Sequence, residues 1–260
     1  MGTSSIYNGP KDRNPLLPEG FEEEYEESLD KSAKETLGSW QETKKVVSQY
    51  ITGSINNRSR ILRNYVKASG GARNSANRAI SGRNSNIQLG RFLSSIISEG
   101  IIKTLESLKI EYKGKSVEAL LSELVNVISP NSNTKEDIVA KNATIQALSQ
   151  LYEYIEENNM DINALDKMND DIFNEVMSSF VSNYIFERML NDLQSRFEKY
   201  AENSQVALDK EKELEEYIKE SVNIKLKKVA LNKLNYNDPS IDSIIKQIYI
   251  ECYEVLEVYI

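Results

Sequence analysis

One long stretch of apolar side chains at helical spacing most constrains the fold of this chain. Between residues 172 and 197, apolar residues recur every three to five positions, which places them on one face of an α-helix. This row consists of Ile172, Val176, Phe180, Tyr184, Met189, Leu193 and Phe197. A second row widens the apolar face and consists of Phe173, Met177, Val181 and Ile185. The pattern predicts a helix that is amphipathic or nearly buried.

Helical spacing continues through most of the chain after residue 38. It predicts helices over residues 40–51, 59–68, 86–108, 117–128 and 241–260, and a polar helix over residues 72–81 that Gly82 ends. Gly100 is a weak point within 86–108. Ser116 is expected to cap the helix that follows it, and Thr134 with Asp137 resembles a capping box.

We therefore predict an all-α fold, a multi-helix bundle with an extended, irregular N-terminal arm. Residues 1–38 form the predicted flexible arm and acidic linker, and residues 39–260 the helical domain. As one alternative, that domain divides into a basic helical part, 39–110, and a helical bundle, 115–260.

The first eighteen residues follow neither a helical nor a strand pattern, because Gly2, Gly9, Pro10, Pro15 and Pro18 interrupt both. The segment still carries apolar side chains suited to docking: Ile6, Tyr7, Leu16 and Leu17. A small residue at position 2 favours removal of Met1, which leaves the free amine of Gly2 at the chain end. Two interpretations stay open, an arm that a partner grips or modifies and a frayed terminus.

Composition excludes several kinds of enzyme. The chain has no histidine and one cysteine, Cys252, so a Ser-His-Asp triad, a Cys-His pair and an HExxH zinc site are impossible. Cys252 lies among apolar helical positions and is expected to be buried rather than nucleophilic. Any enzyme chemistry would have to rest on Asp, Glu, Lys, Tyr or a cofactor, and we expect neither a metal nor a cofactor. Since no secretory signal or membrane-spanning stretch is visible, we also expect it to be cytoplasmic.

Charge is distributed unevenly along the chain. From Thr43 to Ser98 there are ten basic residues and no acidic one, so −18 remains on the rest of a chain with net charge −8. The basic segment could bind a polyanion such as nucleic acid or a nucleotide phosphate, or it could pack against acidic protein surface. We favour acidic protein surface, because the overall negative charge opposes encounter with nucleic acid. The candidate anion-binding side chains are Arg58, Arg63, Arg73, Arg78, Arg83 and Arg91.

Several motifs make the chain similar to a known family. The N-terminal ones are Met1 to Ser5 (MGTSS), residues 8–10 (NGP) and 14–18 (NPLLP). In the body they are residues 67–73 (KASGGAR), 77–79 (NRA), 89–93 (LGRFL), 117–120 (VEAL), 124–130 (LVNVISP) and 189–193 (MLNDL). With these, the chain resembles the QatB family, a component of the four-gene Qat anti-phage defence systems of bacteria. The N-terminal motif is the more specific part of the resemblance.

The resemblance implies a non-enzymatic defence subunit encoded beside an ATPase, a QueC-like deazapurine enzyme (QatC-type) and a TatD-like nuclease. It implies that the body binds the QueC-like enzyme, with the ATPase and nuclease as further partners, and that Gly2 is joined to a deazaguanine. The arm residues expected to contact the partner are Thr3, Ser4, Ser5, Tyr7, Gly9, Pro10, Asn14, Pro15, Leu16, Leu17 and Pro18. The alternatives are a nucleic-acid- or nucleotide-binding sensor that uses residues 58–91, and an assembly subunit whose tail is never modified.

Overall fold

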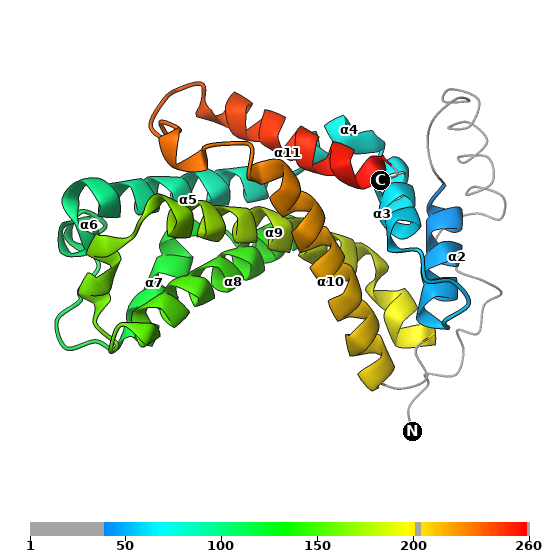
Figure 1. Ribbon diagram of the computed structural model, residues 1–260, viewed down its shortest axis with the longest axis horizontal. Coiled ribbons are helices and arrows are strands. Elements are labelled where there is room, and N and C mark those ends of the chain that lie inside the picture. The colour runs from blue at the N-terminus through cyan, green and yellow to red at the C-terminus, as the bar shows by residue number, and fades with distance from the viewer. Residues whose placement is uncertain (1–38, 201–203, 259–260) are drawn as a thin grey trace. The chain divides into compact units, whose positions relative to one another are not determined.

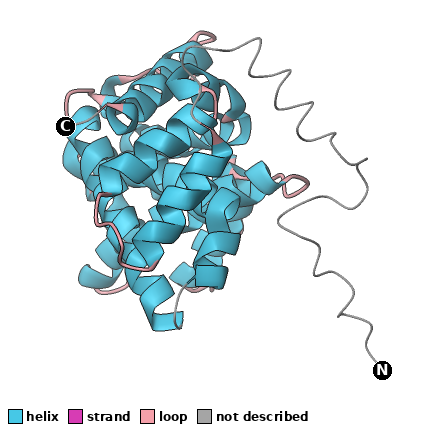
Figure 2. Cartoon of the chain, turned by 90° about the vertical axis from the view of Figure 1, so that its right-hand side faces the viewer, coloured by secondary structure: helices cyan, strands magenta, loops and turns pink. Residues whose placement is uncertain are grey.

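The structure of the protein is a computed structural model that describes residues 39–200 and 204–258. The predicted arm, residues 1–38, lies outside the described residues. Helices account for the regular structure of the described part, which contains no strand (Figures 1 and 2). The prediction of an all-α fold is therefore confirmed. In chain order the elements are α2 (Trp40–Ile51), α3 (Arg58–Ala68), α4 (Gly71–Arg78), α5 (Ile80–Glu99), α6 (Ile101–Ser107), α7 (Val117–Ile128), α8 (Lys135–Glu157), η1 (Ile162–Lys167), α9 (Asp170–Tyr200), α10 (Ser204–Leu226), η2 (Leu231–Lys233) and α11 (Ile241–Glu257).

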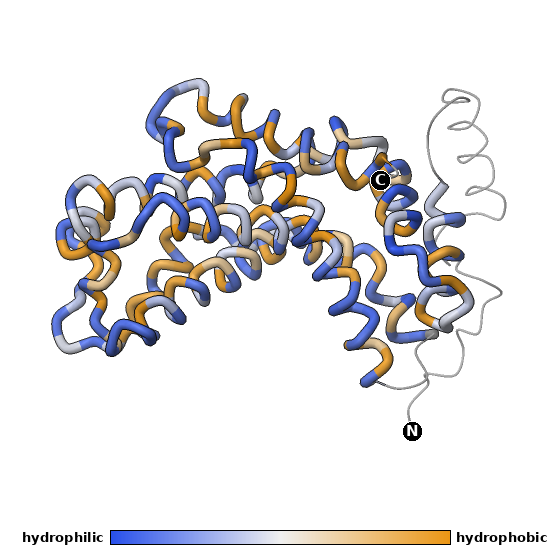
Figure 3. Tube along the Cα trace, in the orientation of Figure 1, coloured by the Kyte–Doolittle hydropathy of each residue, from blue (hydrophilic) through white to orange (hydrophobic). Residues whose placement is uncertain are grey.

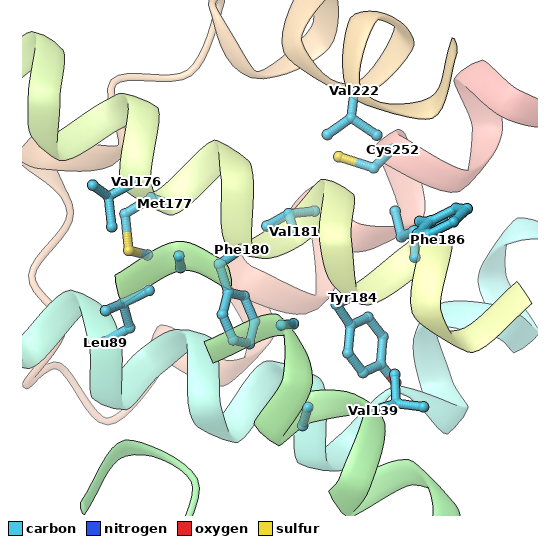
Figure 4. Packing of buried hydrophobic residues seen from close by; sticks show 14 of the residues in the cluster. Leu89, Val139, Val176, Met177, Phe180, Val181, Tyr184, Phe186, Val222 and Cys252 are labelled. Carbon is cyan, nitrogen blue, oxygen red and sulfur yellow. The ribbon is translucent and has the colours of Figure 1, made fainter. Parts of the chain in front are cut away.

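The helix predicted from the apolar rows is α9, and it packs against α2, α5, α8 and α10. Its aromatic side chains Phe173, Phe180 and Tyr184 are fully buried. Figure 4 shows Met177 of α9 pointing toward Leu89 of α5, in a cluster that includes Phe180 and also brings together side chains of α8, α10 and α11. Apolar and polar residues alternate along the surrounding helices (Figure 3), as amphipathic helices around a shared core require.

One hydrophobic cluster includes residues from both parts of the helical domain. It runs from Val46 of α2 to Leu256 of α11. The C-terminal helix α11 packs against α3, α4 and α5 as well as α10. Residues far apart in sequence thus meet around α11, because α4 and α5 both pack against this C-terminal helix.

Local capping follows the sequence at two helices. The Ser116 side chain accepts a hydrogen bond from the backbone N–H of Ala119 at 3.3 Å and begins α7. Thr134 and Asp137 form a reciprocal capping box at the start of α8, although Asp stands where Glu or Gln is usual. Gly100 separates α5 from α6 with a φ of +86°, a backbone conformation that favours glycine.

The predicted boundaries around Gly82 are wrong. The helix α4 ends at Arg78 and α5 begins at Ile80, so Gly82 lies in the first turn of α5 instead of ending a helix. A Cβ at this position would come within 2.4 Å of the Tyr184 ring, so the glycine permits close contact between α5 and α9. The close packing of Tyr184 therefore explains why position 82 is a glycine. The local sequence alone predicts a helix end there.

Candidate functional site

The fold divides the arginine-rich segment, predicted as an anion-binding site, into inward-facing and outward-facing side chains. Arg83 is the most buried of the six candidates, with 8% of its surface exposed. Its Nη1 donates to the carbonyl of Ala76 at 2.6 Å, and its Nε donates to Asp242 at 3.0 Å. The guanidinium therefore satisfies the C-terminal end of α4, where free carbonyls carry partial negative charge, and joins it to the start of α11.

A second arginine reaches the same short helix from α9. Nη1 of Arg188 donates to the carbonyl of Ser75 at 3.0 Å and to the hydroxyl of Tyr184 at 3.4 Å. At the other end of α4, the carboxylate of Glu257 accepts from the backbone N–H of Ala72 at 3.2 Å. Gly70 has no side chain to cap the start of α4. Charged side chains of other helices bind both ends of α4 instead.

The start of α5 is capped across the core in the same way. No side chain of Ala79 can cap this helix, and Glu136 of α8 accepts instead from the backbone N–H groups of Ser81 at 2.9 Å and Gly82 at 3.3 Å. The same carboxylate accepts from the hydroxyl of Tyr184 at 2.8 Å. We call these contacts around α4 and the start of α5 the α4–α5 junction, with Arg83, Arg188, Glu136 and Glu257 as its charged members.

Phenol groups surround the junction on its buried side. Burial raises the pKa of Tyr253 to about 12 and that of Tyr184 well above its ordinary value. Burial opposes the charge on Arg188, but its neighbours Tyr253 and Tyr184 outweigh that effect and raise its pKa. The phenols stay protonated and the guanidinium stays charged at physiological pH, so none of these groups is poised to exchange a proton there.

Arg58 belongs to a separate cluster that joins α2, α3 and α10. Its Nη2 donates to Glu213 at 3.0 Å, and the same carboxylate accepts from the hydroxyl of Tyr50 at 2.7 Å and from Lys210 at 3.2 Å. The hydrogen bond from Tyr50, followed by those from Arg58 and Lys210, lowers the pKa of Glu213 to about 2 despite some burial. We call this group the Glu213 cluster. It holds three helices together.

The remaining candidates differ in exposure. Arg91 is half-buried and donates from Nε to the carbonyl of Tyr236 at 2.9 Å, and Arg63 is half-buried in α3. Arg73 and Arg78 are exposed on α4. Of the six arginines, Arg58, Arg83 and Arg91 therefore form hydrogen bonds to other elements of the fold, and Arg73 and Arg78 face solvent. Arg188, Glu136 and Glu257 were not predicted, although a charged residue inside the apolar rows of α9 is a signal for Arg188.

Every predicted contact residue of the arm, from Gly2 to Pro18, lies outside the described residues. Within residues 39–200 and 204–258, no three Asp, Glu or Cys side chains form a group that could hold a metal ion. In those same ranges, no helix has both the length and the apolar character needed to cross a bilayer.

These features define an all-α protein in which buried and partly buried charged side chains hold helix ends together. The family model described as "Qat anti-phage system associated protein QatB" matches residues 70–256. The chain belongs to this family, and it therefore takes part in anti-phage defence. No curated protein and no solved structure shows significant similarity to it.

The matched range begins at the start of α4 and ends near the end of α11. It includes the α4–α5 junction except Glu257, and it excludes residues 1–69 with the arm. The relationship thus rests on the helical body, whereas the N-terminal motif gave the more specific part of the resemblance.

Proposed function

We propose that the protein is a non-enzymatic subunit of a Qat defence system that presents its processed N-terminal glycine to a QueC-like (QatC-type) enzyme of the same operon. The observation that carries the proposal is QatB membership of a chain that begins Met1-Gly2 and continues with the small residues Thr3, Ser4 and Ser5. The helical body docks on the enzyme in the cytoplasm, and the arm enters the active site.

The chemistry requires an unhindered amine at the chain end. The enzyme first uses ATP to adenylate the carboxylate of 7-carboxy-deazaguanine, which releases pyrophosphate. The neutral amine of Gly2 then attacks the acyl carbon, an amide bond forms, AMP leaves, and the amine nitrogen loses its proton. An α-amine has a pKa of about 8, so a useful fraction is neutral near pH 7. Glycine has no side chain to obstruct the attack.

The described residues support a role other than catalysis for the body. Burial raises the pKa of the Cys252 thiol to about 12, so little thiolate exists at physiological pH. The charged side chains of the α4–α5 junction and of the Glu213 cluster are engaged with helix ends and with one another.

The amine is tested directly by Gly2→Pro in a phage-protection assay with the complete operon. Proline replaces the primary amine with a hindered secondary one, so we expect protection to be lost at normal protein levels. A retained N-terminal tag should have the same effect. Gly20→Pro makes the same substitution elsewhere in the arm and should leave protection intact. Normal protection by Gly2→Pro would contradict the amine proposal.

The arm is also proposed to anchor through Leu16 and Leu17, which lie between Pro15 and Pro18. Flanking prolines favour an extended backbone, so less entropy is lost on binding. We expect the double change Leu16→Ala and Leu17→Ala to weaken binding to the QueC-like enzyme in a titration. Leu208→Ala, at an exposed leucine of α10, is the control. Unchanged affinity of the double variant would assign the interface to the body alone.

A second candidate function is a nucleotide- or nucleic-acid-binding sensor, and the exposure of Arg73 and Arg78 on α4 favours it. Binding through phosphate contacts gives affinity that falls steeply with salt, so filter binding in a salt series separates this candidate from the first.

A further inference from the structure

A polar cleft of about 460 Å³ opens on the body between α5, the α7–α8 connection and the loop that precedes α11. Its lining residues fall between Ser81 and Asp242, so the whole cleft lies inside the range matched by the family model. This volume is in the range typical of ligand sites.

Four carboxamide side chains line this cleft. Asn84 and Gln88 come from α5, Asn131 from the α7–α8 connection, and Asn237 from the loop before α11. Among the described residues, none of these four side chains has a hydrogen-bond partner, and all four residues are exposed. Each carboxamide offers two N–H donors and a carbonyl acceptor, the same groups that a peptide bond presents. The cleft thus holds uncommitted groups complementary to an extended backbone.

The charge of the lining favours a basic ligand. Three aspartates and one arginine line the cleft. Asp137 is occupied by the capping of α8 and by the Ser81 hydroxyl. Asp238 and Asp242 each have one carboxylate oxygen engaged, by Ser240 and by Arg83, and their second oxygens accept no hydrogen bond from the described residues. These two carboxylates attract a cationic side chain and repel a phosphate.

Apolar residues also line the cleft: Val127 and Pro130 come from α7 and the α7–α8 connection, and Pro239 and Ile241 from the loop before α11 and its first residue. We propose that this cleft binds an extended peptide segment that carries a basic side chain. The inference rests on the proposed function in that the partner enzyme supplies the segment. Its backbone pairs with the carboxamides, and its cation lies against Asp238 and Asp242.

Charge at Gln88 tests the inference with little risk to the fold, because this side chain is exposed. Gln88→Arg places a second cation near Arg91, and we expect about a tenfold loss of affinity for the QueC-like enzyme, since like charges oppose binding. Gln88→Glu should bind at least as tightly as the natural chain. Gln146→Arg makes the same change at an exposed position of α8 outside the cleft and should have no effect. Equal affinity of Gln88→Arg and Gln88→Glu would overturn the inference.

A second measurement does not depend on the partner. In nuclear magnetic resonance spectra of the full chain, the peptide acetyl-Gly-Arg-Gly-amide should shift the side-chain amide signals of Asn84, Gln88, Asn131 and Asn237. The peptide acetyl-Gly-Glu-Gly-amide should not. Equal shifts with both peptides, or shifts elsewhere only, would overturn the inference. If the enzyme does not bind the natural chain, the proposed docking is wrong, but this titration still shows whether the cleft binds a basic peptide. If the enzyme binds and the cleft variants change nothing, only the cleft is refuted.

Discussion

Arginines of the same chemistry lie on the two sides of α4 in different surroundings. Arg83 of α5 and Arg188 of α9 lie on the inward side, where their guanidinium groups donate to the carbonyls of Ala76 and Ser75. Arg73 and Arg78 belong to α4 itself and face solvent. The basic segment of the sequence therefore has two roles. Arg83 stabilises a helix end, whereas Arg73 and Arg78 are accessible to a partner.

The largest change in stability is expected on substitution of Arg83, and it distinguishes the inward arginine from the outward ones. Arg83→Met keeps the length of the side chain but removes the charged donor from the Ala76 carbonyl, which keeps the backbone N–H of Ala79, and from Asp242. We expect a loss of about 2–4 kcal/mol in the free energy of unfolding, since two hydrogen bonds of a buried charged group are lost. Arg78→Met, at an exposed position, should change it by less than about 0.5 kcal/mol. Urea denaturation measures both, and equal effects would remove the distinction between the two sides.

The next largest change in stability is expected where α5 packs closely against α9. Gly82→Ala adds a methyl group where a Cβ would lie 2.4 Å from the Tyr184 ring. We expect a loss of about 1–3 kcal/mol, because overpacking displaces the ring that donates to Glu136. Asn84→Ala, exposed on the same helix, is the matched control for thermal unfolding. A Gly82→Ala variant as stable as this control would show that the junction is loosely packed.

The Glu213 cluster should make the stability of the protein depend on pH. The pKa of this carboxyl falls from its ordinary 4.5 to about 2 in the folded chain, so its contribution to stability is present above pH 4.5. That contribution is lost as pH falls through 4.5 toward 2. Glu213→Gln should cost about 1 kcal/mol at pH 7, allowing for solvent screening, and should flatten the pH dependence of stability in this window. An unchanged pH profile would mean that the cluster contributes nothing to stability.

The smallest effect is expected on the outward side. Changing Arg73 and Arg78 together to Ala should leave the free energy of unfolding within about 0.5 kcal/mol of the natural value. We also expect the natural chain to bind duplex DNA more weakly than about 10 μM at physiological salt. A submicromolar dissociation constant that this double variant abolishes would favour the sensor function.

The sequence predicts features that depend on neighbouring residues. The apolar rows of α9, the capping box at Thr134 and the burial of Cys252 all follow from local patterns. It could not distinguish Arg83 from Arg78, because the partner of Arg83, Asp242, lies 159 positions away. Gly82 is misread for the same reason, since its contact is a ring on α9. The arm contacts from Gly2 to Pro18 stay a prediction.

We propose that the N-terminal glycine becomes joined to a deazaguanine. Intact mass spectrometry of the protein co-expressed with its complete operon, followed by peptide mapping, tests it most directly. We expect loss of Met1 and an added deazaguanine acyl group on Gly2, which should be absent when the QueC-like enzyme is deleted. An unmodified glycine in the presence of a functional operon would rule out the conjugation and favour a purely structural subunit.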